Sequence, residues 1–170
     1  MIESEKKLKD LQGKIFSQNK KVVSDAIISL RNEDPFRGAI GLLVDLFDKT
    51  NDLMVKDLIR NFLNDIKEPA AITEVMEEVL KYYRPDTISM LVSSCWQSGL
   101  NYSGFALDFA NVFIRGDYLT SLECFTVIEE SVHHLTSLEK NELIGLLEKN
   151  KRNFTVEKNK LLEALLMALR

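Results

Sequence analysis

Residues 38–66 read GAIGLLVDLFDKTNDLMVKDLIRNFLNDI, and this stretch decides the fold class. On both sides of the tripeptide at 50–52, apolar residues recur every three or four positions, which is the spacing of an amphipathic α-helix. Asp52 stands directly before the second apolar stripe, where its carboxylate can accept hydrogen bonds from the free backbone N–H groups of a helix start. The stretch therefore predicts two helices joined by a tight turn.

The same turn recurs along the chain at a nearly constant interval. An Asp or Asn marks the turn at five anchors, which are Asn19, Asp52, Asp86, Asp117 and Asn153. Successive anchors are 33, 34, 31 and 36 residues apart, and a period of this length is typical of repeat proteins. A two-helix unit of this size cannot bury its apolar stripe alone, so neighbouring units must stack. The sequence predicts an all-α fold, a short right-handed α-solenoid of about five antiparallel helix pairs, in a single domain over residues 1–170.

Other turn signals divide the chain into ten helices of about 12 to 18 residues. Each proline comes shortly before an apolar stripe, which suits the first helical turn, and these are Pro35, Pro69 and Pro85. We expect Asp34 to be the N-cap ahead of Pro35. Gly99 and Gly116 follow apolar stripes, as glycines in the left-handed conformation do at helix C-termini. Residues 136–139 read TSLE and predict a capping box.

Residues 35–66 resemble a HEAT repeat, of the armadillo-like α-solenoid family. In that family an Asp in the turn is often followed three and four residues later by a Val and a basic residue, and here these are Asp52, Val55 and Lys56. The anchors at 86 and 117 keep only the acid. The resemblance implies that the second helix of each pair lines a concave face. A tetratricopeptide array has a similar period, but its Trp and Leu-Gly signature is missing, so the HEAT-like interpretation is favoured.

The charge balance disfavours nucleic acid as a partner. The chain has 22 Lys and Arg against 26 Asp and Glu, a net charge of -4, and an acidic surface repels phosphate. Lysines gather within residues 1–22 and 149–160, and HEAT-like folds also occur in alkylpurine DNA glycosylases, whose groove is positive. Residues 117–150, however, are mainly acidic. A nucleic-acid-binding or DNA-repair protein is therefore the alternative function.

The sequence predicts a cytoplasmic protein that has no membrane partner. The first twenty residues are charged, so they do not form the apolar segment of a secretory signal. The most apolar windows are interrupted by Asp45 and Glu163 and fall short of the ~20 residues that a membrane span needs. Cys95 and Cys124 lie in apolar stripes, where buried thiols in a reducing compartment are expected.

Residues 129–134 read EESVHH and form the one cluster with metal-ligand spacing. Glu130 and His134 lie one helical turn apart, as do Glu129 and His133, and carboxylate with imidazole can bind zinc or iron. A ferritin-like site would need a second Glu-x-x-His helix, which is absent. We expect a solvated helix face, with a metal-binding helical protein as a further alternative. No nucleophile–base pair or phosphate-binding loop is found either, so no enzyme, catalytic residue, cofactor or metal is predicted.

The polar faces of the central second helices are the predicted binding surface for a protein or peptide. Its candidate residues are Lys56, Asp57, Arg60, Asn61, Ser93, Ser94, Trp96, Gln97, Glu123, Thr126, Glu130 and His133. The surface runs from basic or neutral to acidic, which suits a partner of complementary charge. The only tryptophan, Trp96, is either a core residue or an aromatic interface anchor.

The last helix is apolar on more than one face, since residues 161–170 read LLEALLMALR. Two arrangements account for this pattern. Either the helix packs over the core, or Leu162, Leu166 and Leu169 are partly exposed and seek a partner. The second arrangement predicts a homodimer through the C-terminal helix.

Overall fold

The computed structural model describes residues 2–170, and this part of the chain is all-α, as predicted. It contains ten α-helices and no strand. The helices are α1 (Glu3–Ile15), α2 (Lys20–Ser29), α3 (Ala39–Lys49), α4 (Leu53–Asn64), α5 (Ala71–Val79), α6 (Pro85–Gln97), α7 (Ala106–Arg115), α8 (Tyr118–Ser131), α9 (Ser137–Asn150) and α10 (Val156–Leu169). They are 9 to 14 residues long, shorter than predicted, because short 3-10 turns and extended connections take up several helix ends. No described helix combines the length and apolar content of a membrane crossing.

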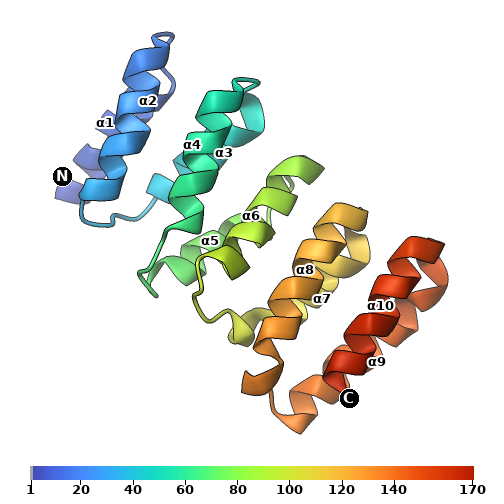
Figure 1. Cartoon of the computed structure of the whole chain (residues 1–170). Helices are drawn as coiled ribbons and strands as arrows, with labels where there is room; N and C mark the ends of the chain where they lie inside the picture. The colour runs from blue at the N-terminus through green and yellow to red at the C-terminus, as the bar shows by residue number, and fades with distance from the viewer. Residues whose placement is uncertain (1) are drawn as a thin grey trace.

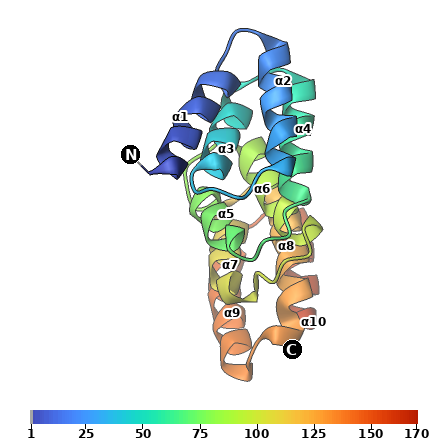
Figure 2. The ribbon, with the colours of Figure 1, turned by 90° about the vertical axis from the view of Figure 1, so that its left-hand side faces the viewer.

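The helices lie in two rows, as Figures 1 and 2 show. One row holds the first helix of each pair and the other holds the second helix. In the second row each helix packs on the next, so that α2 contacts α4, α4 contacts α6, α6 contacts α8 and α8 contacts α10. In the first row α1 contacts α3, α3 contacts α5 and α7 contacts α9. The two ends of the chain therefore lie at opposite ends of the stack (Figure 1).

A single apolar core runs through the stack between the two rows. Its fully buried members come from both rows, for example Phe47 of α3, Ile59 of α4, Phe109 of α7 and Ile128 of α8. The core extends into the last helix, where three leucines are at most 2% exposed: Leu162, Leu166 and Leu169. Of the two arrangements considered for this helix, packing over the core is the observed one. The exposed leucines on which the homodimer prediction depended are not present.

Several predicted helix-start signals are confirmed. The side chains of Asn19, Asp52 and Asp117 accept hydrogen bonds from the first backbone N–H groups of α2, α4 and α8. Pro85 is the first residue of α6. Thr136 and Glu139 form the predicted capping box of α9. Local sequence chemistry therefore fixes where most of these helices start.

Other predicted boundaries were wrong. Asp34 does not cap a helix and Pro35 does not begin one, because α3 starts only at Ala39. The residue before it is Gly38, whose φ of 95° is left-handed. Pro69 likewise lies in a connection, two residues before α5.

One of the two predicted C-terminal glycines and two of the five turn anchors also differ from their predicted positions. Gly99 is left-handed as predicted, with φ of 72°, whereas Gly116 has an extended backbone with φ of −76°. Asp86 lies in the first turn of α6 and not at its N-cap. Asn153 ends a 3-10 turn, and the N-cap of α10 is Thr155. An acid or amide near a turn therefore predicts a helix start to within a few residues only.

Candidate functional site

The structure brings the predicted binding residues together on three adjacent helices. They come from α4, α6 and α8, which are consecutive members of the second row and pack on one another. His133 alone lies outside them, in the 3-10 turn that follows α8. These side chains differ in how far they are exposed and in the partners that they bond.

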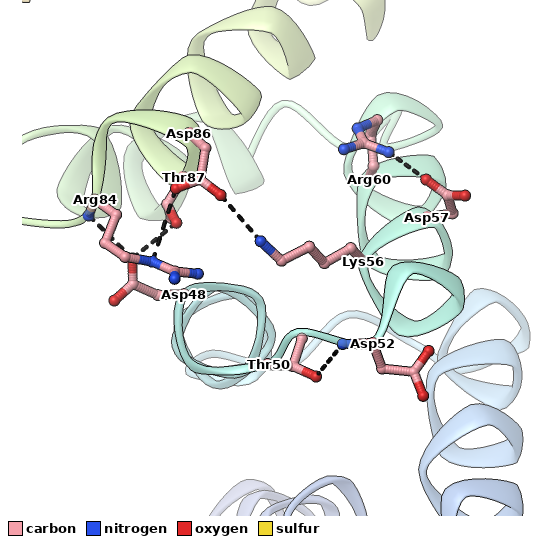
Figure 3. Close-up of polar contacts among 9 residues, drawn as sticks. All are labelled: Asp48, Thr50, Asp52, Lys56, Asp57, Arg60, Arg84, Asp86 and Thr87. Atoms are coloured by element: carbon pink, nitrogen blue, oxygen red, sulfur yellow. Dashed lines mark hydrogen bonds and ion pairs between the residues drawn. The ribbon is translucent and has the colours of Figure 1, made fainter.

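Lys56 joins two helices and is not a free cation on the surface. Its Nζ donates to Oδ2 of Asp86 at 2.9 Å, which ties α4 to the first turn of α6 (Figure 3). The same ammonium lies 4.7 Å from the ring centroid of Phe47, within the range of a cation–π contact. Its side chain is 13% exposed. This lysine therefore joins adjacent helix pairs.

Asp48 makes the second connection at this junction. Its Oδ1 accepts the backbone N–H of Arg84 at 3.0 Å and the hydroxyl of Thr87 at 2.7 Å (Figure 3). A carboxylate from the end of α3 thus satisfies a backbone donor at the start of α6. Sequence reasoning missed this role, because the two ends of the contact are 36 residues apart.

Three further residues of α4 remain close to solvent. Arg60 pairs with Asp57 one turn away (Figure 3). Its guanidinium lies 5.7 Å from the Phe47 ring centroid. Asp57 and Asn61 are exposed. The outward face of α4 therefore presents an internally paired arginine beside one carboxylate and one amide.

On α6, the prediction was wrong for Ser94. This side chain is 2% exposed, and its hydroxyl donates to the carbonyl of Leu91 at 2.6 Å. It faces the core because its helix is packed between α4 and α8. Gln97 is exposed and donates to Ser93 Oγ at 2.8 Å, while its own oxygen accepts from Asn64 of α4 at 3.1 Å.

Trp96 connects α6 to α8. Its indole Nε1 donates to Oε2 of Glu123 at 2.7 Å, and its half-buried ring packs against the core. The core interpretation is therefore partly correct, and the role of an aromatic interface anchor stays a prediction. Because the contact occupies the indole N–H, a partner would meet only the exposed part of the ring.

The acidic end of the predicted surface lies on α8. Thr126 donates to the carbonyl of Leu122 on its own helix at 3.2 Å, and Glu130 and His133 are exposed. The helix ends at Ser131, so the pairs of carboxylate and imidazole do not share one α-helical face as the sequence suggested. Within residues 2–170, no group of three His, Cys, Asp or Glu residues is arranged to hold a metal ion.

Both cysteines are buried, and neither forms a disulfide. Burial raises the pKa of the Cys95 thiol and that of the Cys124 thiol, because the thiolate would lose its hydration. The expectation of buried thiols is confirmed. Neither cysteine is positioned as a reactive nucleophile.

Sequence reasoning missed a row of exposed apolar residues at the starts of the second helices. Its members are Val22 on α2, Leu53 and Met54 on α4, Tyr118 and Leu119 on α8, and Val156 on α10. We call this set the apolar row. Leu53 is 76% exposed and Leu119 is 63% exposed. The signal was an apolar residue placed directly after a predicted N-cap, as in Asp52-Leu53 and Asp117-Tyr118. In α4 and α8 these residues occupy the first two helical positions, directly before the buried Val55 and Thr120.

Comparisons with protein-family models, with curated proteins and with solved structures found no match to this chain. The likeness of residues 35–66 to a HEAT repeat thus depends on the sequence pattern. The structure adds the contacts that this pattern makes, chiefly the Lys56–Asp86 pair between consecutive second helices.

Proposed function

We propose that this chain is a non-catalytic protein-interaction module, a HEAT-like right-handed α-solenoid of five antiparallel helix pairs. Its partner is a protein or peptide that lies across the second helices. The observation that carries the proposal is the apolar row, whose members come from α2, α4, α8 and α10, while α6 contributes none. Exposed apolar side chains that gather at one edge of a protein often mark an interaction site.

The helix arrangement supports this proposal because it places the members of the apolar row at intervals along one edge. Consecutive second helices pack on one another, so an extended partner would contact several of them at once. On α4 and α8, exposed polar residues lie further along the same helices: Asp57, Asn61 and Glu130. A partner that extends from the apolar row along these helices would contact both apolar and polar side chains, as partners do in protein interfaces.

The experiment compares two variants that remove the same kind of side chain. Leu53→Ser with Leu119→Ser disrupts the apolar row, whereas Leu107→Ser with Leu138→Ser removes exposed leucines of α7 and α9, in the first row. Each tagged protein is used for affinity purification from the native cell, followed by quantitative mass spectrometry. We expect a partner that is retained by wild type and by the first-row variant and is lost by the apolar-row variant.

Circular dichroism and urea unfolding of both variants test whether the fold is intact. Equal recovery of every protein by all three baits would contradict the proposal. Equal loss from both variants would also contradict it, because binding would then not depend on the second helices.

A further inference from the structure

A cavity of about 500 Å³ opens beside the connections that lead from α2 to α3 and from α4 to α5. It lies between the connection that enters α3, the end of α4 and the start of α5. The apolar row belongs to the tight turns at the other end of these helices, so the two features are separate. A volume of this size falls within the range of ligand-binding sites.

The inner wall of the cavity is apolar. Its main side chains are those of Leu30, Phe36, Ala39, Ile40, Phe62 and Ile66. Four of them are buried, and the two phenylalanine rings are half-buried. A ligand can therefore cover apolar surface here that water now covers, which favours binding of an apolar side chain.

The rim of the cavity carries an excess of negative charge. Its six carboxylates belong to Glu33, Asp34, Asp65, Glu68, Glu74 and Glu77, and they face only two arginines. Both arginines are already paired, Arg31 with Asp65 at 2.8 Å and Arg37 with Glu77 at 3.1 Å. No salt bridge within residues 2–170 involves Asp34 or Glu68. The unneutralised charge would favour a cationic ligand.

Three contacts join the walls of the cavity. The Arg31–Asp65 pair joins the end of the first repeat to the end of α4, and the Arg37–Glu77 pair joins the α3 connection to α5. The backbone N–H of Gly38 also donates to Oε1 of Glu74 at 2.8 Å. These contacts are formed without a ligand, so binding does not have to create them.

We propose that this cavity binds a basic peptide segment, in which an apolar side chain enters the cavity and neighbouring Lys or Arg residues contact the rim. The apolar wall accounts for the first part of this chemistry and the carboxylates for the second. An acidic or neutral segment would bring the carboxylates out of water without giving them a partner. A second copy of this chain fits less well, since its net charge is -4.

The test uses a fluorescein-labelled heptapeptide, Gly-Lys-Arg-Phe-Lys-Arg-Gly, with the full chain. Two further peptides replace its Phe by Ser, or its four basic residues by Glu. Fluorescence anisotropy gives the affinity, and amide chemical shifts of the 15N-labelled protein locate the contact. We expect saturable binding of the basic Phe peptide, which weakens at high salt. The Ser peptide should lose at least fivefold in affinity, which corresponds to about 1 kcal/mol. The Glu peptide should not bind. The shifted amides should lie in residues 30–40 and 62–77.

Two pairs of variants separate this site from general attraction between charges. Asp34→Lys with Glu68→Lys should weaken binding about tenfold, while Glu129→Lys with Glu142→Lys changes the net charge equally on α8 and α9 and should leave it unchanged. Ala70→Trp should fill the cavity mouth and block the peptide. Ala164→Trp, on the exposed side of α10, is its control.

The variant Leu53→Ser with Leu119→Ser should bind the peptide as wild type does, so failure of this proposal and failure of the proposed function are distinguishable. Three results would overturn the cavity proposal. One is no saturable binding below about 1 mM, and another is equal weakening by both pairs of charge reversals. The third is a concentration-dependent shift of the cavity amides without peptide, which would identify a second copy of the chain as the occupant.

Discussion

Lys56 Nζ lies 2.9 Å from Oδ2 of Asp86, so a cation on α4 meets the first turn of α6, thirty residues further along the chain. Lys20 makes the same connection one pair earlier, with its Nζ 3.0 Å from Oδ2 of Asp52. In both cases a lysine of one second helix meets an acid at the start of the next. A negative charge at that position also interacts favourably with the positive end of the helix dipole.

Replacing Lys56 by Met is expected to destabilise the fold. The variant loses the ion pair with Asp86 and the cation above the Phe47 ring. Because Asp86 is about half exposed, solvent screens part of the attraction, and we expect a loss of about 1 kcal/mol in the free energy of unfolding. Urea unfolding measures it. The same change at Lys20, whose side chain is 79% exposed, should have a smaller effect; a larger one would contradict this account.

The stabilisation from the Lys56–Asp86 pair should depend on pH. The hydrogen bond from Lys56 lowers the pKa of the Asp86 carboxyl in the folded state. A lowered carboxyl pKa stabilises the fold above the unfolded value of about 3.9, and this stabilisation is lost as the pH falls through the folded value. The difference in unfolding free energy between wild type and Lys56→Met should therefore be constant near neutral pH and shrink below about pH 4. When Asp86 is replaced by Asn, the loss of unfolding free energy caused by Lys56→Met should be the same at pH 7 and at pH 3.

Gly38→Ala should destabilise the protein, whereas Gly145→Ala should not. Gly38 has φ of 95°, and an added Cβ would lie 2.8 Å from Cδ1 of Leu8. The left-handed backbone alone costs an alanine roughly 1–2 kcal/mol. Gly145 lies within α9, where an added Cβ meets nothing within 4 Å, so its replacement should stabilise the helix by up to about 1 kcal/mol. Urea midpoints that shift in the same direction for both variants would refute this assignment.

Lys158 is a buried lysine, and its replacement by Met should be strongly destabilising. Its Nζ donates to the carbonyls of Ile114 at 2.9 Å and Gly116 at 2.7 Å, which connects α10 to the turn between α7 and α8. Without the ammonium these two acceptors lose their charged donor, and we expect a loss of about 2–3 kcal/mol. Thermal and urea unfolding measure it. Lys160→Met, at an exposed position of the same helix, should change the stability much less, and equal losses would contradict the role given to Lys158.

Helix content and most helix starts could be predicted because they depend on neighbouring residues. The side chains of Asn19, Asp52 and Asp117 bond N–H groups two or three residues away, so the local sequence contains both partners. The start of α3 could not be predicted in this way. The N–H of Gly38, the residue before the helix, donates to Glu74, which is 36 residues distant and so is not part of the local sequence.

The candidate surface was less predictable than the fold. Ser94 and Lys56 have polar side chains at positions that a single amphipathic helix would give to solvent, yet one is buried and the other is paired across helices. Leu53 shows the reverse, an apolar residue of the expected stripe that faces water. Which side of a helix is covered depends on its rotation against two neighbours in its own row.

By itself, the sequence of this protein determined that the chain is helical, about where its second helices start, and that its two cysteines are buried. These properties follow from periodicity of 3.6 residues and from caps that bond within one turn. Only the tertiary structure decided which lysines join adjacent pairs, that Trp96 donates to Glu123, and that a cavity with an acidic rim opens between the connection entering α3, the end of α4 and the start of α5. Those features arise between residues about thirty positions apart, where the packing of side chains sets the offset of one helix against the next.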